Sequence, residues 1–235
     1  MLYIIIFAII TKDWISYGII ASIVKRKEIM LTIALPKGRI AEETLEIFTE
    51  IFGGEFKFES RKLILDIGEF RFLNVRNQDV PTYVEHGAAD IGVVGLDVIT
   101  EKELDIIKLL DMQLGKCKVS IGIKNEDELD WNKPNIKIAT KMVNITKDYF
   151  SQKAVGVEVI KLYGSIELAP LVGLADAIVD IVETGSTMRE NGLKVAEDIM
   201  DSSAHLIANK NSYYSKKEEI LSLYEKIDQV VQSRA

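Results

Sequence analysis

From residue 31 onward, short apolar runs alternate with stretches in which apolar residues recur at helical spacing. The run LTIAL (31–35) predicts a buried strand, and the apolar positions from Ile40 to Ile51 predict an amphipathic helix after it. Glu42 and Glu43 fall in the first turn of this helix, where negative charge suits the helix dipole. A strand followed by a helix is a natural beginning for an α/β domain.

The same alternation continues through the first half of the chain. Further strands are predicted at KLILDI (62–67), FRFLNV (70–75), ADIGVVG (89–95) and GKCKVSIGI (115–123). Gly68 predicts a hairpin between the first two of these strands. Asp79 is suited to the N-cap of a short helix, since Pro81 follows just inside it.

A charged segment, KNEDELDWNKPN (124–135), interrupts the pattern, and we interpret it as a linker or an exposed loop. A second series follows, with strands at IKIAT (136–140), VEVIKLY (157–163), DAIVDIV (176–182) and AHLIAN (204–209), helices near 145–153 and from Ser165, and an amphipathic helix near the end. Two such series predict an α/β protein with parallel sheets covered by helices on both faces. They also predict two lobes with a ligand cleft between them.

Composition and charge narrow the functional classes. The chain has 235 residues and a net charge of −7, which argues against a general binder of nucleic acid or of membrane surfaces. Its single cysteine, Cys117, excludes an intramolecular disulfide framework and any multi-cysteine metal site. His86 and His205 are too far apart in sequence for a zinc-like spacing. Anionic small ligands stay compatible with this composition, because they respond to local charge.

The first residues differ from the rest of the chain. Residues 1–24 are strongly apolar, but Lys12 and Asp13 lie in the middle, where charge is costly in a bilayer. We expect Met30 to be the biological start and residues 1–29 to be an extension outside the fold. The alternative is a membrane anchor whose basic end, KRK (25–27), would keep the domain on the cytoplasmic side. Both interpretations place the functional domain in the cytoplasm.

The stretch DIVETGSTM (180–188) carries the strongest chemical signal. A predicted strand ends in Thr184, Gly185, Ser186 and Thr187, where a glycine turn, backbone N–H groups and hydroxyls can surround a phosphate. Asp180 and Glu183 stand beside this loop. Carboxylates are unfavourable next to a phosphate unless they accept hydrogen bonds from sugar hydroxyls or share a magnesium ion. A sugar phosphate can use both the phosphate-binding loop and the neighbouring carboxylates. The alternative interpretation of this stretch is a plain turn with a helix cap and no ligand.

Basic residues gather in the first half of the chain. LPKGRI (35–40) sets Lys37 and Arg39 between a strand and a helix, at the edge where open α/β sheets bind ligands. Arg76 ends another predicted strand, and Arg61 adds to the same positive charge. These cations suit a polyphosphate; the alternative for the loop is ordinary solvated charge. Cys117 lacks an evident basic partner and is predicted to be a small buried residue rather than a nucleophile.

Taken together, several motifs make the chain resemble the ATP phosphoribosyltransferase family. They are ALPKGRI, SRKLI, RNQDVPTYVEHGAADIGVVGLDV, KIAT, IKLYGSIELAPLVGLADAIVDIVETGSTMRENGL and SSAHLIAN. The resemblance runs from about Met30 to the end of the chain. It implies two lobes like those of type II periplasmic binding proteins, with the chain crossing between them twice. Lobe I would comprise 30–119 plus 204–235, and lobe II 120–203 with the phosphate loop.

The resemblance also implies a reaction and roles. The family joins N1 of the ATP adenine to C1 of phosphoribosyl pyrophosphate (PRPP) and releases pyrophosphate, the first step of histidine biosynthesis. Thr184–Thr187 would hold the 5-phosphate, with Asp180 and Glu183 facing the ribose hydroxyls. Arg39 and Arg61, assisted by Lys37, would neutralise the leaving pyrophosphate. Arg76, Asp79 and Glu167 are candidates for contacting ATP or supporting these groups. Mg²⁺ would bind mainly through substrate phosphates, with Asp180 or Glu183 as candidate ligands.

The resemblance further implies the short form of the family, which works with a separate regulatory subunit resembling histidyl-tRNA synthetase. We therefore expect a homodimeric core within a hetero-oligomer, and neither nucleic acid nor a membrane as partner. Two other functions share these features. One is a two-lobed small-molecule binding or sensor protein, and the other is a phosphoribosyltransferase for a different nucleobase.

Overall fold

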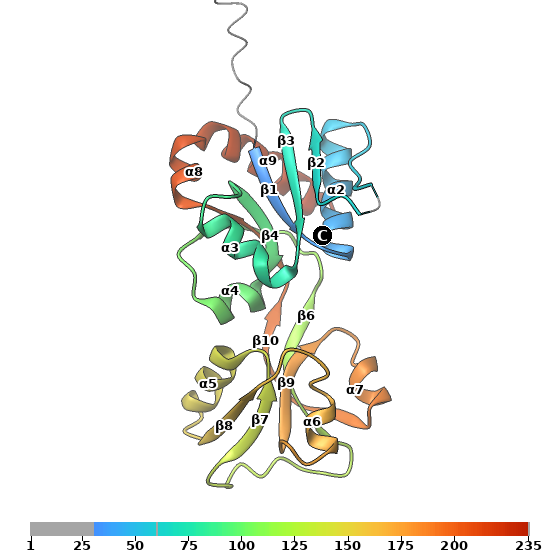
Figure 1. The fold of residues 1–235 in the computed structure, drawn as a ribbon, viewed down its shortest axis with the longest axis vertical. Coiled ribbons are helices and arrows are strands. Elements are labelled where there is room, and N and C mark those ends of the chain that lie inside the picture. Colours follow the sequence, from blue (N-terminus) through green and yellow to red (C-terminus); the bar gives the residue numbers. More distant parts are fainter. Residues whose placement is uncertain (1–30, 60, 235) are drawn as a thin grey trace, which may run out of the picture.

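The structure is a computed structural model that describes residues 31–59 and 61–234. It divides them into two lobes, each built on its own β-sheet (Figure 1). The expectations for residues 1–29 and for Met30 as the start concern positions outside the described residues. Within the described ranges, no helix is long and apolar enough to cross a membrane.

Lobe I contains a six-stranded sheet in the order β2-β3-β1-β4-β11-β5. Its strands are β1 (Leu31–Pro36), β2 (Ile64–Ile67), β3 (Phe70–Val75), β4 (Ile91–Gly95), β5 (Ile107–Asp111) and β11 (Ala204–Ala208). β1 pairs in parallel with β3 and β4, while β2, β11 and β5 run antiparallel to their neighbours. The hairpin predicted around Gly68 is confirmed as β2–β3.

Helices cover both faces of this sheet. They are α2 (Arg39–Phe52), the 3₁₀ turn η1 (Asn77–Asp79), α3 (Val80–Glu85), α4 (Leu96–Lys102), α8 (Lys210–Ser215) and α9 (Lys217–Arg234). α2 and α9 pack on one face, where Phe48 meets Phe72 edge-on and Ile227 is fully buried. α3 and α4 pack on the other face through Val84 and Val98. The 3.6-residue pattern of α2 thus does bury its apolar stripe against the sheet.

Lobe II contains a five-stranded sheet in the order β10-β6-β9-β7-β8. Its strands are β6 (Cys117–Lys124), β7 (Ile136–Thr140), β8 (Val157–Lys161), β9 (Ala177–Val182) and β10 (Leu193–Ser202). The helices are α5 (Val143–Gln152) on one face, and α6 (Leu168–Leu171) and α7 (Ser186–Glu190) on the other. β7 pairs in parallel with β8 and β9, and β6 pairs antiparallel with β9 and β10.

The expectation of parallel sheets was wrong, because both sheets are mixed. Apart from the β2–β3 hairpin, the antiparallel pairings involve strands next to the two crossings between the lobes. β11 re-enters lobe I between β4 and β5, and β6 and β10 run side by side in opposite directions. Alternating strands and helices explain only the parallel part of each sheet.

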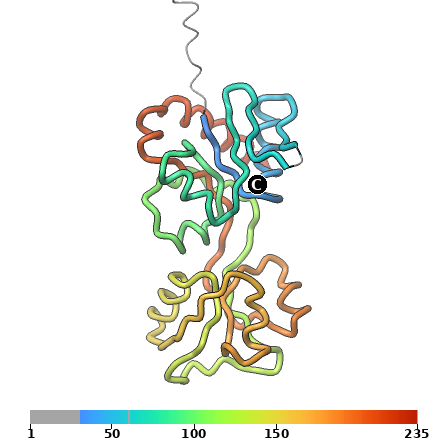
Figure 2. The backbone as a smooth tube through the Cα atoms, viewed as in Figure 1, coloured from blue at the N-terminus to red at the C-terminus, as the bar shows by residue number. Residues whose placement is uncertain are grey.

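The chain crosses between the lobes twice, and the two crossings lie side by side (Figure 2). The Ala204 N–H donates to the Leu114 carbonyl (2.9 Å), and the Met112 N–H donates to the Ala204 carbonyl (2.9 Å). The charged segment 124–135 instead connects β6 to β7 within lobe II, so it is an exposed loop. Its interpretation as the linker between lobes was wrong, since charge and missing periodicity mark any solvated connection.

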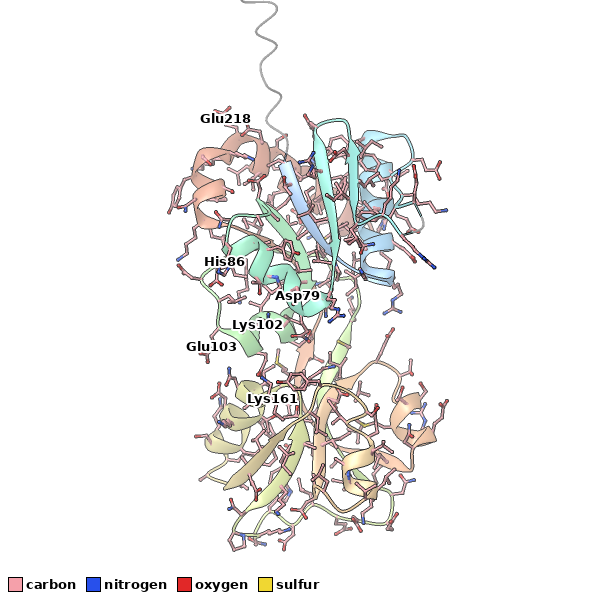
Figure 3. All side chains as sticks on the ribbon, in the orientation of Figure 1. Asp79, His86, Lys102, Glu103, Lys161 and Glu218 are labelled. Atoms are coloured by element: carbon pink, nitrogen blue, oxygen red, sulfur yellow. The ribbon has the colours of Figure 1, made fainter. Side chains whose placement is uncertain are left out.

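The parallel strands of both sheets point their carboxyl ends toward the other lobe (Figure 1). Figure 3 shows this at two labelled residues: Asp79, which follows β3, lies on the side of lobe I that faces lobe II, and Lys161, at the end of β8, lies on the opposing side of lobe II. Loops at carboxyl ends of strands form the ligand sites of open α/β sheets. The facing edges of the two lobes are therefore where functional groups should lie.

Candidate active site

The loop that follows β9 is shaped by a glycine in the left-handed region. Gly185 has φ of +70°, and α7 begins immediately after it at Ser186. Arg189 closes the turn, because its Nη1 donates to the Thr184 carbonyl (2.9 Å). The loop is therefore a defined turn at the end of a central strand.

A pocket of about 270 Å³ opens at this loop. It is lined by Glu167, Asp180, Ile181, Val182, Glu183, Thr184, Gly185, Ser186, Thr187 and Met188. The structure thus brings together all six residues that the sequence predicted for PRPP, together with Glu167 from the segment before α6. A space of this size suits a sugar phosphate better than a whole nucleotide.

The pocket offers several donors to an anion. The Thr184 hydroxyl donates to the Ser186 hydroxyl (3.1 Å), and the Ser186 N–H lies 3.4 Å from Thr184 Oγ1. Within the described part of the chain, the N–H groups of Gly185 and Thr187 make no hydrogen bond. Two free amides and three neighbouring hydroxyls on a tight turn are typical of a phosphate-binding loop.

Each acid beside the loop is paired with a cation. Asp180 Oδ1 lies 3.0 Å from Lys141 Nζ, and Glu183 Oε1 lies 2.8 Å from Arg39 Nη1. The second pair joins the lobes, since Arg39 begins α2 and Glu183 follows β9. The hydrogen bond that Arg39 donates to Glu183 raises the pKa of Arg39 above its usual value. The cations offset the negative charge that would otherwise repel a phosphate.

The other predicted cations of lobe I lie at strand ends. Lys37 and Arg76 follow paired strands β1 and β3, and the Lys37 N–H donates to the Val75 carbonyl (2.8 Å). Both side chains are exposed, as is Asp79 in η1. Arg61 is exposed in the turn before β2, and no hydrogen bond or ion pair joins it to the pocket in the described residues.

Sequence reasoning missed Lys141. It directly follows β7, and its partner Asp180 lies on the adjacent strand β9, far away in sequence. The only signal was a lysine at the carboxyl end of a predicted strand, which is a common place for a ligand contact. The pairing itself depends on strand order, which no local pattern reveals.

Cys117, His86 and His205 do not line the pocket. Burial raises the pKa of the Cys117 thiol, with the Asp97 carboxylate adding to the effect, so the thiolate is disfavoured. His86 contacts the Thr82 carbonyl and His205 the Ser203 carbonyl, and neither lines the pocket. The described site is one of hydroxyls, amides, carboxylates and cations, a set of groups that suits a sugar phosphate.

Comparison with known proteins identifies the family. The family model described as ATP phosphoribosyltransferase matches residues 76–229, well over half of the chain. The chain belongs to the ATP phosphoribosyltransferase family. An ATP phosphoribosyltransferase of Sulfurovum sp. (strain NBC37-1) is 88% identical over 205 residues, which are 87% of this chain and 100% of that relative. The chain is therefore a pentosyltransferase that joins ATP to PRPP, the first step of histidine biosynthesis.

Solved structures agree with the family fold. The ATP phosphoribosyl transferase (HisG:HisZ) complex from Thermotoga maritima matches with a TM-score of 0.76 and 36% identity, covering 87% of this chain and 100% of that one. A substrate binding protein of an amino acid ABC transporter matches with a TM-score of 0.56 and 11% identity, covering 86% and 92%. The predicted two-lobed fold of the type II periplasmic binding proteins is confirmed. At 11% identity, the second likeness concerns the fold alone and gives the sensor interpretation no support.

Proposed function

We propose that the pocket at the end of β9 binds the ribose 5-phosphate part of PRPP, and that Arg39, Arg61 and Lys37 neutralise the leaving pyrophosphate. One observation carries this proposal. Asp180 and Glu183–Thr187 line one pocket, and Arg39 reaches it from the other lobe. The substrate would therefore lie between the lobes, with its phosphate on lobe II and its pyrophosphate toward lobe I.

The charges suit the reaction. As N1 of adenine forms its bond to C1 of the ribose, the C1–O bond breaks and its electron pair leaves with pyrophosphate. Positive charge develops on the ribose and negative charge on the leaving group. A guanidinium aimed at that group stabilises the separation, and one preorganised donor contributes about 3 kcal/mol. N1 already carries a lone pair, so its attack requires no general base.

The paired acids have a distinct role in this proposal. Asp180 is half-buried at the pocket wall, and no described residue donates to its Oδ2. That oxygen is free to accept a hydrogen bond from a ribose hydroxyl. Glu183 is more exposed and trades its bond to Arg39 for a hydroxyl when PRPP enters. Release of Arg39 then makes the guanidinium available to the pyrophosphate.

ATP would be held by groups on both sides of the facing edges. Arg76 and Asp79 follow β3 in lobe I, and Glu167 lines the pocket in lobe II. A cation beside a carboxylate suits a nucleotide, because the first can contact phosphates and the second can accept from an amino or hydroxyl group. These three residues support binding rather than bond making in this proposal.

Mg²⁺ would arrive with the substrate. In the described residues, no cluster of three histidine, cysteine or acidic side chains could hold a metal ion. Asp180 and Glu183, the two candidate ligands, are already paired with cations. The residues present therefore do not form a dedicated metal site, and the proposal derives no protein-bound metal step. The ion is part of the magnesium complex of PRPP.

We also propose a regulatory partner that resembles histidyl-tRNA synthetase, bound to a homodimeric core. The Thermotoga maritima neighbour was solved as a HisG:HisZ complex, which supports a partner for this chain. We further place the reaction in the cytoplasm, where ATP is available as the substrate.

Replacing the proposed cations tests the assignment. We expect Arg39→Ala and Arg61→Ala to lower kcat about a hundredfold, because each removes charge stabilisation of the leaving group. The KM for ATP should change much less. Initial rates would follow the ultraviolet absorbance of phosphoribosyl-ATP, with pyrophosphatase present and the regulatory subunit added.

Arg71→Ala is the matched control. Arg71 also lies in lobe I, but it forms a surface pair with Asp66 on β2 (2.7 Å), away from the pocket. Its kcat should stay close to that of the wild type. Unchanged turnover in both Arg39→Ala and Arg61→Ala would remove these residues from the leaving-group site.

A further inference from the structure

Lys141 lies beside Asp180, which lines the pocket, and its backbone is held between two buried residues. Thr140 before it and Met142 after it are buried. The Thr140 hydroxyl donates to the Val179 carbonyl (2.7 Å) and accepts from the Met142 N–H (2.9 Å). The lysine therefore leaves the end of β7 in a fixed direction, toward the neighbouring strand β9.

The ammonium group of Lys141 contacts the acid that faces the pocket. Its Nζ lies 3.0 Å from Asp180 Oδ1, and that oxygen also accepts from the Ile181 N–H (2.8 Å). The side chains of Lys141 and Asp180 are only 32% and 16% exposed, so solvent screens this pair less than an exposed pair such as Lys62 and Glu59. With Oδ1 occupied twice, the orientation of the carboxylate is set, and Oδ2 is left for a ligand.

Lys141 also interacts electrostatically with groups outside lobe II. It acts electrostatically on Asp97, a buried residue of α4 in lobe I, and on Cys117 at the crossing between lobes. The acidic groups that face the lysine are thus Asp180 from β9 and Asp97 from α4. Without this cation, Asp180 would be an unpaired carboxylate at the wall of a pocket whose substrate is itself strongly anionic.

We propose that Lys141 is a positioning residue for the phosphoribosyl substrate. It acts through Asp180, which it keeps oriented and electrically balanced so that Oδ2 meets the ribose hydroxyls. This inference rests on the proposed assignment of Asp180 to PRPP. It gives Lys141 no contact with the reacting atoms, and it predicts that the residue matters for PRPP and not for ATP.

The test compares charge removal at Lys141 with the same change at Lys137, on the strand before it. Lys141→Met should raise the Kd for PRPP about tenfold or more, as expected for the loss of one oriented, partly buried ionic contact. Lys141→Arg, which keeps the charge, should recover most of the affinity. Lys137→Met is the matched control, because Lys137 lies on β7, the strand that Lys141 follows, and its ammonium forms a long surface pair with Glu158 (3.8 Å). Calorimetric titration of the full chain with magnesium PRPP gives the Kd.

A double-mutant cycle separates positioning from structural damage. If Lys141 acts through Asp180, then Lys141→Met should cost nothing further in an Asp180→Asn background. The KM for ATP should stay within about twofold of the wild type in Lys141→Met, because uniform damage would change both substrates. Thermal unfolding of each variant shows whether the fold is intact.

Each outcome has a distinct meaning. Weaker PRPP binding in Asp180→Asn with no change in Lys141→Met would overturn the inference and leave the proposed site standing. No change in Asp180→Asn would remove the proposed site itself. Equal losses from Lys141→Met in both backgrounds, or equal losses in Lys137→Met, would show that the lysine does not work through Asp180.

Discussion

At the scale of single residues, Gly185 decides the shape of the loop that we propose binds phosphate. Its φ of +70° suits glycine, and a Cβ there would approach Arg189 Nη1 at 3.0 Å, the atom that closes the turn on Thr184. We expect Gly185→Ala to raise the Kd for PRPP about tenfold, because the strained turn misplaces the amides. Titration with magnesium PRPP measures this.

Gly192 supplies the control for that change. It has almost the same φ, +71°, in the same lobe, and a Cβ there would meet nothing within 4 Å. Gly192→Ala should lose ~1 kcal/mol of stability from the same backbone strain as Gly185→Ala, but it should keep the wild-type affinity for PRPP. Equal Kd values for the two variants would mean that the phosphate binds elsewhere.

At the scale of elements, Asp90 ties the C-terminal helices to the sheet of lobe I. Its carboxylate, 9% exposed, accepts from the Thr32 N–H (2.8 Å), the Ser212 hydroxyl (2.7 Å) and Lys216 Nζ (2.7 Å). It therefore joins the start of β4 to β1 and to the junction of α8 and α9. Few other single groups in the described chain connect so many elements.

We expect Asp90→Ala to lower the free energy of unfolding by about 3 kcal/mol or more, because it removes the mostly buried carboxylate to which three groups from three segments donate. Urea denaturation measures this. Asp105→Ala is the comparison, since Asp105 pairs with Lys210 of α8 at 77% exposure and should cost less than about 1 kcal/mol. A similar loss in both variants would contradict the anchoring role of Asp90.

At the same scale, the strands show which parts of the fold could be predicted from the sequence. β1, β4, β7 and β9 were predicted because buried parallel strands are continuous apolar runs. β10 was missed because Leu193–Ser202 mixes acids with apolar residues at the edge of a sheet. The pocket loop Glu183–Thr187 could be singled out, since its residues are consecutive, and its role in binding phosphate is a proposal. Lys141 could not, because its partner Asp180 becomes a neighbour only through strand order.

At the scale of the whole molecule, Asp97 lies where the lobes join. It is 3% exposed, and its Oδ1 accepts from the hydroxyl of Ser202, the last residue of β10 (2.9 Å). Burial raises the pKa of Asp97 above its unfolded value of 3.8. Its contribution to stability is therefore fully present below that unfolded pKa and is lost as pH rises through the folded pKa.

Asp97→Asn keeps the shape and the acceptor but removes the charge. We expect it to be more stable than the wild type at pH 7, by about 1 kcal/mol, with the difference vanishing in acid below the unfolded pKa. Urea denaturation across pH tests this. Asp66→Asn should instead be less stable than the wild type at pH 7, because the hydrogen bond from Arg71 lowers the pKa of Asp66. A pH-independent gain for Asp97→Asn would rule out its ionisation as the cause.

The position of β11 has a consequence for folding during synthesis of the protein. β11 fills the space between β4 and β5, although all of lobe II is translated before it. A growing chain therefore cannot close the sheet of lobe I for on the order of ten seconds after β4 has left the ribosome. During that interval the edge of β4 is open, and lobe II receives its last strand, β10, before β11 is made. The second lobe in sequence is thus the first that can finish folding.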